Sequence, residues 1–180
     1  MKKITQSLFV MLGLIGFNTQ VLFAQPSVSA TMPPARLTAK VISIFSDAYT
    51  NVTGTNFYAS WGQATVVSMT QIGTDNILKY ANLNYQGTEL SGSVNAITMD
   101  KLHIDVWSSD GTSFQITPIS HGPKEKLVTL TPLNLNTWNS YDINLSDFAG
   151  VDFSDIFQFK IVGSGTFYID NLYFYDILTQ

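Results

Sequence analysis

The chain of 180 residues contains no cysteine, so no disulfide can stabilise the fold, and burial of a hydrophobic core must do so. Arginine is almost absent, because Arg36 is the only one, and nine Lys and Arg stand against 13 Asp and Glu. Nucleic acids and anionic polysaccharides are bound by clustered basic side chains, so this balance argues against both as partners. Glutamate is also scarce: Glu89 and Glu125 do not form the paired carboxylates that glycoside hydrolysis requires.

Residues 1–24 have the pattern of a secretory signal peptide. Lys2 and Lys3 precede an apolar run over residues 8–17, and Ala24 offers a small residue before Gln25. The apolar run is too short to be read as a membrane span. We therefore expect cleavage near Ala24 and an exported, monomeric protein with no membrane span.

The mature chain reads as one all-β domain behind a short lead-in. Residues 25–39 are rich in Pro, Ser and Thr and predict a flexible lead-in, so the domain is expected over 40–178. Asp110-Gly111 predicts a β-hairpin, Gly163-Ser164-Gly165 predicts a turn, and no stretch has a sustained helical period. Many short strands separated by turn residues indicate an antiparallel β-sandwich, specifically a jelly roll. The predicted strands are 40–45, 65–72, 77–85, 87–91, 101–108, 114–119, 127–130, 137–145, 155–162 and 166–175. Residues 57–61 begin either another strand or an ordered loop.

The predicted strand 101–108 has an unusual polar side. Leu, Ile and Val alternate with His103, Asp105 and Trp107, so these three residues share one face of the sheet. An aromatic ring stacks on the C–H face of a sugar, while imidazole and carboxylate groups hydrogen-bond its hydroxyls. We interpret the three residues as part of a sugar-binding platform; the alternative is a solvated face that happens to carry a Trp.

Neighbouring strands can extend this platform with aromatic and amide side chains. Tyr80, Tyr85 and Gln86 belong to predicted strand 77–85 and its end, and Gln115 is expected to lie across the hairpin from 101–108. Trp61, between small and polar residues, can present an indole from a loop. The alternatives are that either tyrosine is buried in the core and that Trp61 covers one end of the sandwich.

Four segments resemble a known family: 41–47, 102–107, 138–148 and 168–175. Over about residues 40–176 the chain resembles secreted carbohydrate-binding modules of the jelly-roll, galactose-binding-domain-like kind, which commonly accompany bacterial glycoside hydrolases. The resemblance implies the sandwich fold and non-catalytic sugar binding. It also implies that Trp138 packs in the interior.

The resemblance further implies a structural Ca²⁺. Asp47 begins an oxygen-rich loop after the first predicted strand, and Asp170 lies in the last predicted strand. The first and last strands of a jelly roll tend to be close, and Ca²⁺ takes six to eight oxygen ligands in irregular geometry. Asp47 and Asp170 are thus the candidate metal ligands; the alternative is two solvated or backbone-capping carboxylates.

Together these patterns favour non-catalytic binding of a neutral polysaccharide such as a β-glucan. Two other functions stay open. One is a small polysaccharide lyase or glycoside hydrolase that uses His103 with a Tyr or Asp. The other is a surface adhesion module whose aromatic face binds protein.

Overall fold

The computed structural model describes residues 24–178, so all but the last residue of the predicted signal peptide lies outside the described chain. Within this range, no helix is long and apolar enough to cross a membrane. The elements are η1 (Thr38–Lys40), β1 (Val41–Phe45), β2 (Val66–Ile72), β3 (Asp75–Val94), β4 (Lys101–Ser108), β5 (Ser113–Ser120), β6 (Lys124–Glu125), β7 (Val128–Thr129), β8 (Trp138–Asn144), η2 (Leu145–Asp147) and β9 (Ile156–Tyr175). Residues 57–61 form a loop, the second of the two predicted alternatives.

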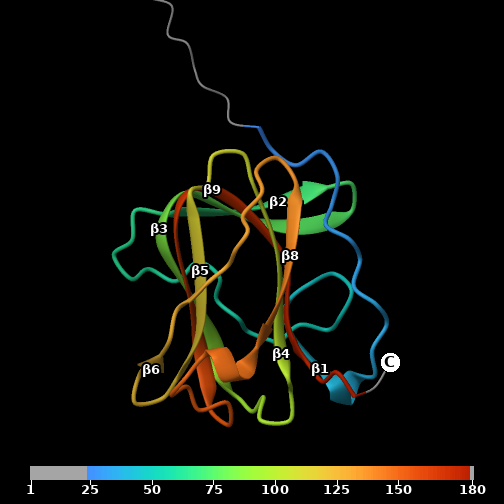
Figure 1. Ribbon diagram of the computed structural model, residues 1–180, viewed down its shortest axis with the longest axis vertical. Helices are drawn as coiled ribbons and strands as arrows, with labels where there is room; N and C mark the ends of the chain where they lie inside the picture. Colours follow the sequence, from blue (N-terminus) through green and yellow to red (C-terminus); the bar gives the residue numbers. More distant parts are fainter. Residues whose placement is uncertain (1–23, 179–180) are drawn as a thin grey trace, which may run out of the picture.

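All pairings between these strands are antiparallel, and the sheet folds over into two layers, as a jelly-roll sandwich does (Figure 1). The first layer contains β2, residues 75–81 of β3, residues 167–175 of β9, β4, β8 and β1. The second layer contains the remainder of β3 and β9 with β5, β6 and β7. The long strands β3 and β9 therefore belong to both layers.

Two bends, one in β3 and one in β9, carry these strands from one layer to the other. Asn82 in β3 has φ 53°, and Gly165 in β9 has φ 126°, where a side chain would be strained. A Cβ atom on Gly165 would also lie only 2.8 Å from the Cα atom of Gly111. A glycine that permits a bend and one that permits a reversal look the same in sequence, so the turn predicted at Gly163-Ser164-Gly165 is wrong. Residues 77–91, predicted as two strands, belong to the single strand β3.

The predicted hairpin around Asp110-Gly111 is also wrong. β4 and β5 do not pair with each other: β4 pairs with β8 and β9, whereas β5 pairs with β6, β7 and the other half of β9. The connection is an arch between the layers, held by Ser108, whose Oγ accepts from Gly111 N at 2.7 Å and donates to Thr166 O at 2.7 Å. β4 and β5 consequently expose opposite faces of the sandwich.

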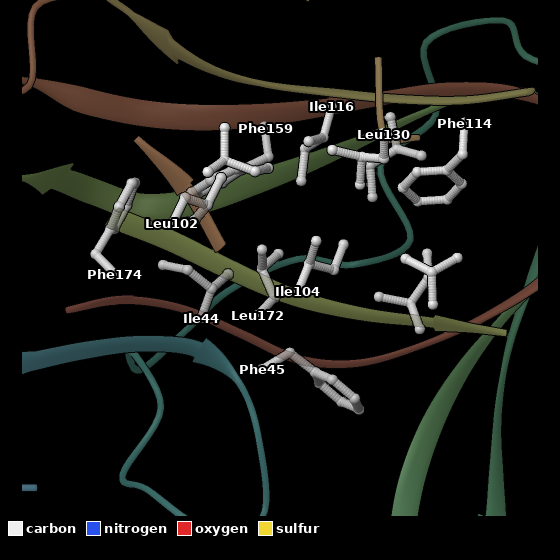
Figure 2. Packing of buried hydrophobic residues seen from close by; sticks show 14 of the residues in the cluster. Ile44, Phe45, Leu102, Ile104, Phe114, Ile116, Leu130, Phe159, Leu172 and Phe174 are labelled. Carbon is white, nitrogen blue, oxygen red and sulfur yellow. The ribbon is translucent and has the colours of Figure 1, made fainter. Parts of the chain in front are cut away.

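A hydrophobic core fills the space between the layers (Figure 2). Leu102, Ile104 and Leu172 approach it from the first layer, and Ile116 and Phe159 approach it from the second. The core includes Leu102, Ile104 and Val106, so the predicted alternation of β4 is confirmed. His103, Asp105 and Trp107 thus point away from the core.

Residues 24–37, expected to be a flexible lead-in, lie against the first layer (Figure 1, blue). Their backbone carbonyls accept hydrogen bonds from the sheet side: Val28 O from Trp138 Nε1 at 2.8 Å and Pro34 O from Tyr49 OH at 2.6 Å. Arg36 lies 4.0 Å from the centre of the Tyr175 ring. This part of the predicted lead-in is a covering segment of the domain.

Candidate functional site

The residues predicted to form one sugar platform lie in three separate parts of the sandwich. His103, Asp105 and Trp107 are on the outer face of the first layer, whereas Tyr85 and Gln115 are on the outer face of the second layer. The arch between β4 and β5 causes this separation, so Gln115 does not lie across a hairpin from β4. Tyr80 is fully buried beside Leu78 in the core, and its assignment to the platform is corrected.

The outer surface around His103, Asp105 and Trp107, here the Trp107 face, is largely covered. Asp105 is 1% exposed and Trp107 is 5% exposed. The indole of Trp107 packs edge-on against Tyr168, with ring centres 5.5 Å apart, and residues 24–31 lie beside it. Trp107 therefore cannot offer a whole ring face to a sugar, in contrast to the prediction.

His103 is held between two carboxylates on the Trp107 face. Its Nδ1 lies 2.7 Å from Asp142 Oδ1, its Nε2 lies 3.5 Å from Asp105 Oδ1, and its ring stacks on Tyr173 at 4.7 Å. Burial opposes the charged form, but hydrogen bonds and charge attraction from both carboxylates outweigh it and raise the pKa of His103 to about 9. The imidazole is thus protonated at neutral pH and has no free lone pair for general base catalysis.

Asp105 has its acceptors filled by neighbouring side chains. Ser140 Oγ donates to Asp105 Oδ1, and Asn171 Nδ2 donates to Oδ2 at 2.8 Å. A buried carboxylate with these partners and a protonated imidazole beside it is a structural group. The prediction that Asp105 accepts hydrogen bonds from sugar hydroxyls is therefore corrected.

The two candidate metal ligands are close to each other. β1 pairs with β9, as expected for a jelly roll, so the loop after β1 that carries Asp47 begins beside the strand that carries Asp170. Asp170 is 1% exposed, and its Oδ2 has no hydrogen-bond partner. Burial and then the charge of Asp75 raise the pKa of Asp170 to about 8. Asp47 differs, because both its oxygens accept from Asn76, at 2.6–3.1 Å.

An orphaned buried carboxylate oxygen beside a second carboxylate fits a hard cation, which would remove the cost of bringing these charges together. The contact of Asp75 with both Asp47 and Asp170 was not anticipated from the sequence. Within residues 24–178, however, no three His, Cys, Asp or Glu side chains have the spacing of a metal cluster. Asp170 and Asp75 fit the expected Ca²⁺, and Asp47 fits less well.

Trp61 is the aromatic residue that the structure presents on the second layer. A Cβ atom on Gly87 would lie 2.4–2.5 Å from Cδ2, Cε2 and Cζ2 of Trp61, three consecutive atoms of the six-membered ring. Near-equal distances to three ring atoms place that position over the ring centre, so the indole lies flat on the sheet. Trp61 Nε1 donates to Glu89 Oε1 at 2.8 Å, which fixes the orientation of the ring.

The loop that carries Trp61 is anchored to β3 by amide groups. Gln63 Oε1 accepts from Trp61 N at 2.6 Å, and Gln63 Nε2 donates to Ala59 O at 2.6 Å and Gln86 Oε1 at 2.9 Å. Tyr85 OH donates to Trp61 O at 2.8 Å. Gln86 is buried, so both it and Tyr85 support the loop, and Gln86 is not exposed for sugar contacts as predicted.

Polar side chains of β9 and β5 lie beside Trp61. Gly87 is the register partner of Lys160, and Glu89 is the register partner of Gln158. Lys160 Nζ pairs with Glu125 Oε1 across the layer at 2.5 Å. Gln115 Nε2 donates to Thr129 Oγ1 at 2.9 Å on the same side. We call this surface the Trp61 face; it contains Trp61, Tyr85, Glu89, Gln115, Glu125, Gln158 and Lys160.

Two members of this site could have been found from the sequence. Gly87 is an isolated glycine within a predicted strand, a signal that another group closely approaches the backbone. Gln63 lies two residues from Trp61, close enough to brace its loop. Lys160 was missed because nothing local shows that it lies opposite Gly87.

Comparison with known proteins supports the fold and goes little further. No protein-family model matches the chain, and no curated protein sequence matches it. Among solved structures, the family 11 carbohydrate-binding module of a cellulosomal cellulase from Clostridium thermocellum is similar, with a TM-score of 0.53 and 19% identity. The alignment covers 78% of this chain and 96% of that module.

A second structure of the Clostridium thermocellum family 11 module contains a β-1,3-1,4-mixed-linked tetrasaccharide. It has a TM-score of 0.52 and 21% identity, covering 78% of this chain and 97% of the module. The chain therefore has the jelly-roll fold of carbohydrate-binding modules, as the sequence resemblance implied. At this identity the likeness concerns the fold alone.

Proposed function

We propose that this protein is a secreted, non-catalytic, monomeric module that binds a neutral polysaccharide on the Trp61 face. The observation that carries the proposal is the indole of Trp61 lying flat over Gly87, with Nε1 fixed by Glu89. A ring held parallel to a sheet can stack on the C–H face of a pyranose without first losing conformational freedom.

The charges on the Trp61 face support a neutral ligand. Lys160 is paired with Glu125, and Glu89 accepts from both Trp61 and Asn56. The one cation thus lies among carboxylates, which disfavours an anionic polysaccharide. Gln115 and Gln158 add amide groups that can donate to and accept from hydroxyls.

A β-glucan is the first ligand class to test, because a fold neighbour binds a β-1,3-1,4-linked tetrasaccharide. That neighbour supplies the probe and no residue roles. The extent of the Trp61 face, from Trp61 over β3 across β9 to Gln115 on β5, suits several successive sugars of a chain.

The arrangement of the two glutamates supports a non-catalytic role. Glu89 lies on β3 and Glu125 on β6, with β9 and β5 between them. Glu89 accepts hydrogen bonds from Trp61 and Asn56, Glu125 is paired with Lys160, and the protonated His103 adds no base.

The proposal includes a structural Ca²⁺ bound by Asp170 and Asp75, with Asp47 nearby. The ion would neutralise the buried carboxylates and coordinate Asp170 Oδ2, which has no hydrogen-bond partner. In a chain without cysteines, such an ion would link Asp170 of β9 to Asp75, the first residue of β3. Its role would be stability and not catalysis.

Affinity electrophoresis in soluble β-1,3-1,4-glucan tests the sugar-binding proposal. The wild type should be retarded, and Trp61→Ala should lose about tenfold or more of the affinity. Tyr58→Ala is the matched control, since Tyr58 is an exposed aromatic residue in the same loop region. Equal retardation of wild type and Trp61→Ala would refute the Trp61 face as the site.

Thermal unfolding with and without Ca²⁺ tests the metal. A free concentration of about a thousand times Kd should stabilise the wild type by about 4 kcal/mol. Asp170→Asn should abolish this gain, whereas Asp147→Asn, which changes an exposed carboxylate, should preserve it. A wild-type Tm that does not respond to Ca²⁺ or chelator would exclude the site.

A further inference from the structure

We propose a second sugar-binding site, on the opposite side of the sandwich from the Trp61 face, in the pocket between Trp138 and the covering segment 24–31. The pocket has a volume of 530 Å³, within the range of small-ligand sites. Trp107 and Trp138 both line it, and they are register partners on β4 and β8. This site is separate from the Trp61 face.

The two indoles have different roles in this pocket. Trp107 is 5% exposed and packs against Ile77 and Tyr168, so it forms a fixed floor. Trp138 lies on the edge strand β8 opposite Trp107 and is half-buried, so the interior position implied by the resemblance is corrected. Its Nε1 donates to Val28 O at 2.8 Å, which fixes the ring while leaving part of it accessible. Trp138 is therefore the stacking residue.

The chemistry of the lining identifies the ligand class. Within residues 24–178, no charged side chain lines the pocket; beside the indoles, its polar side chains are hydroxyls and amides, including Gln25, Ser27, Asn136 and Thr137. Ions would find no counter-charge there, and a purely apolar ligand would leave these groups unpaired. A neutral sugar presents apolar C–H faces and hydroxyls, and it matches both parts of the lining.

The pocket wall opposite the covering segment is structurally defined. Asn136 has φ 59°, a left-handed conformation, and its backbone N donates to Ser108 O at 2.7 Å. Asn136→Gly can therefore remove an amide from the pocket while keeping the turn, because glycine adopts positive φ without strain.

Two sites on opposite faces would make the module bivalent. Such a protein can bridge two polysaccharide chains, and bridging requires both sites at once. Loss of either site should abolish cross-linking of a soluble polysaccharide while single-site binding persists. Cross-linking therefore distinguishes two sites from one extended site.

The test titrates wild type, Trp61→Ala and Trp138→Ala with a β-1,3-1,4-linked tetrasaccharide and with the soluble glucan polymer. Calorimetry should give two sites per wild-type chain and one in each variant, and only the wild type should cross-link the polymer. In Trp61→Ala, the indole N–H signal of Trp138 should still shift in NMR spectra. Asn136→Gly should weaken the second site about threefold to tenfold with an unchanged Tm.

The outcomes separate this site from the proposed function. If Trp61→Ala abolishes all binding, the second site is refuted and the Trp61 face stands. If Trp138→Ala abolishes binding and Asn136→Gly weakens it while Trp61→Ala has no effect, the second site stands and the Trp61 face is refuted. A wild type that binds neither probe refutes both. Trp138→Phe, which keeps a ring but not the bond to Val28, shows whether a loss in Trp138→Ala comes from stacking.

Discussion

The Trp61 face and the Trp107 face contain similar side chains but differ in how far these side chains are buried. Each has an indole, tyrosines and carboxylates on the outer side of a layer. Trp107 projects from a strand and is covered, whereas Trp61 projects from a loop and lies flat over a glycine. The indole of Trp107 is buried and packs within the domain. The indole of Trp61 is only half-buried, as a ligand-stacking ring must be.

This comparison separates two properties that strand alternation does not distinguish. Alternation decides which layer face a side chain joins, and for His103, Asp105 and Trp107 it did so correctly. Exposure depends on what lies above that face, here residues 24–37. A polar and aromatic strand face is thus equally consistent with a ligand site and with an internal interface.

Deleting residues 25–37 should produce the largest effect. The deletion removes the contacts of this segment with Trp107, Trp138 and Tyr175, and partial exposure of these three aromatic side chains should lower the free energy of unfolding by about 2–4 kcal/mol. Urea unfolding measures this change.

The control for the deletion is Val28→Ser with Met32→Ser. Both side chains are exposed, and the segment is held through its carbonyls, so stability should change little. An unchanged free energy of unfolding in the deletion variant would show that the segment does not stabilise the domain.

Replacing His103 with Gln should have the next largest effect, and it should depend on pH. The pKa of His103 is raised to about 9 from 6.5, so its contribution is complete below about pH 6.5 and is lost as the pH rises through 9. Because Asp142 is half-exposed, we expect roughly 2 kcal/mol at low pH and little difference near pH 10.

Urea unfolding of both proteins across this pH range gives the difference directly. Asp170 titrates in both, so its contribution largely cancels from the comparison. A difference that grows with pH would contradict the assignment of a protonated His103.

Gly87→Ala tests whether the flat position of the Trp61 ring is needed for binding on the Trp61 face. The added methyl occupies the position that the Trp61 ring covers, so the indole must move and affinity for the soluble β-glucan should fall about tenfold. Gly92→Ala is the control, because Gly92 is in the same strand with open space around it. Equal affinities would mean that the flat ring is not required.

Glu89→Gln should have the smallest effect. The amide oxygen can still accept from Trp61 Nε1, so we expect less than about a twofold change in glucan affinity. Glu89→Ala should cost more, since it leaves the indole N–H without its partner. A large loss in Glu89→Gln would indicate that the negative charge itself contacts the ligand.

The sequence was sufficient for the fold class because strand alternation is local. The inward positions of 101–108 and the proximity of the first and last strands were predicted correctly. The assignment of each strand to a layer was not predicted correctly. Asp110-Gly111 forms an arch because its flanking strands, β4 and β5, do not pair with each other. That choice depends on β9, some fifty residues further along.

The candidate site was predicted only in part, for physical reasons. Trp61 was recognisable as a loop indole, but its position over Gly87 was not predicted. The burial of Trp107 was not visible, because the covering segment bonds through backbone carbonyls, which every residue possesses. The contact between Asp75 and Asp170 joins a turn to a distant strand, and no local pattern predicts it.

The position of β9 also constrains when the protein can fold. This strand pairs with β1, β3, β4 and β5, so residues 156–175 complete both layers. A chain still on the ribosome, with β9 unsynthesised, lacks the strand between β3 and β4 in one layer and between β3 and β5 in the other. Neither layer of this domain can therefore be completed before residues 156–175 have been synthesised.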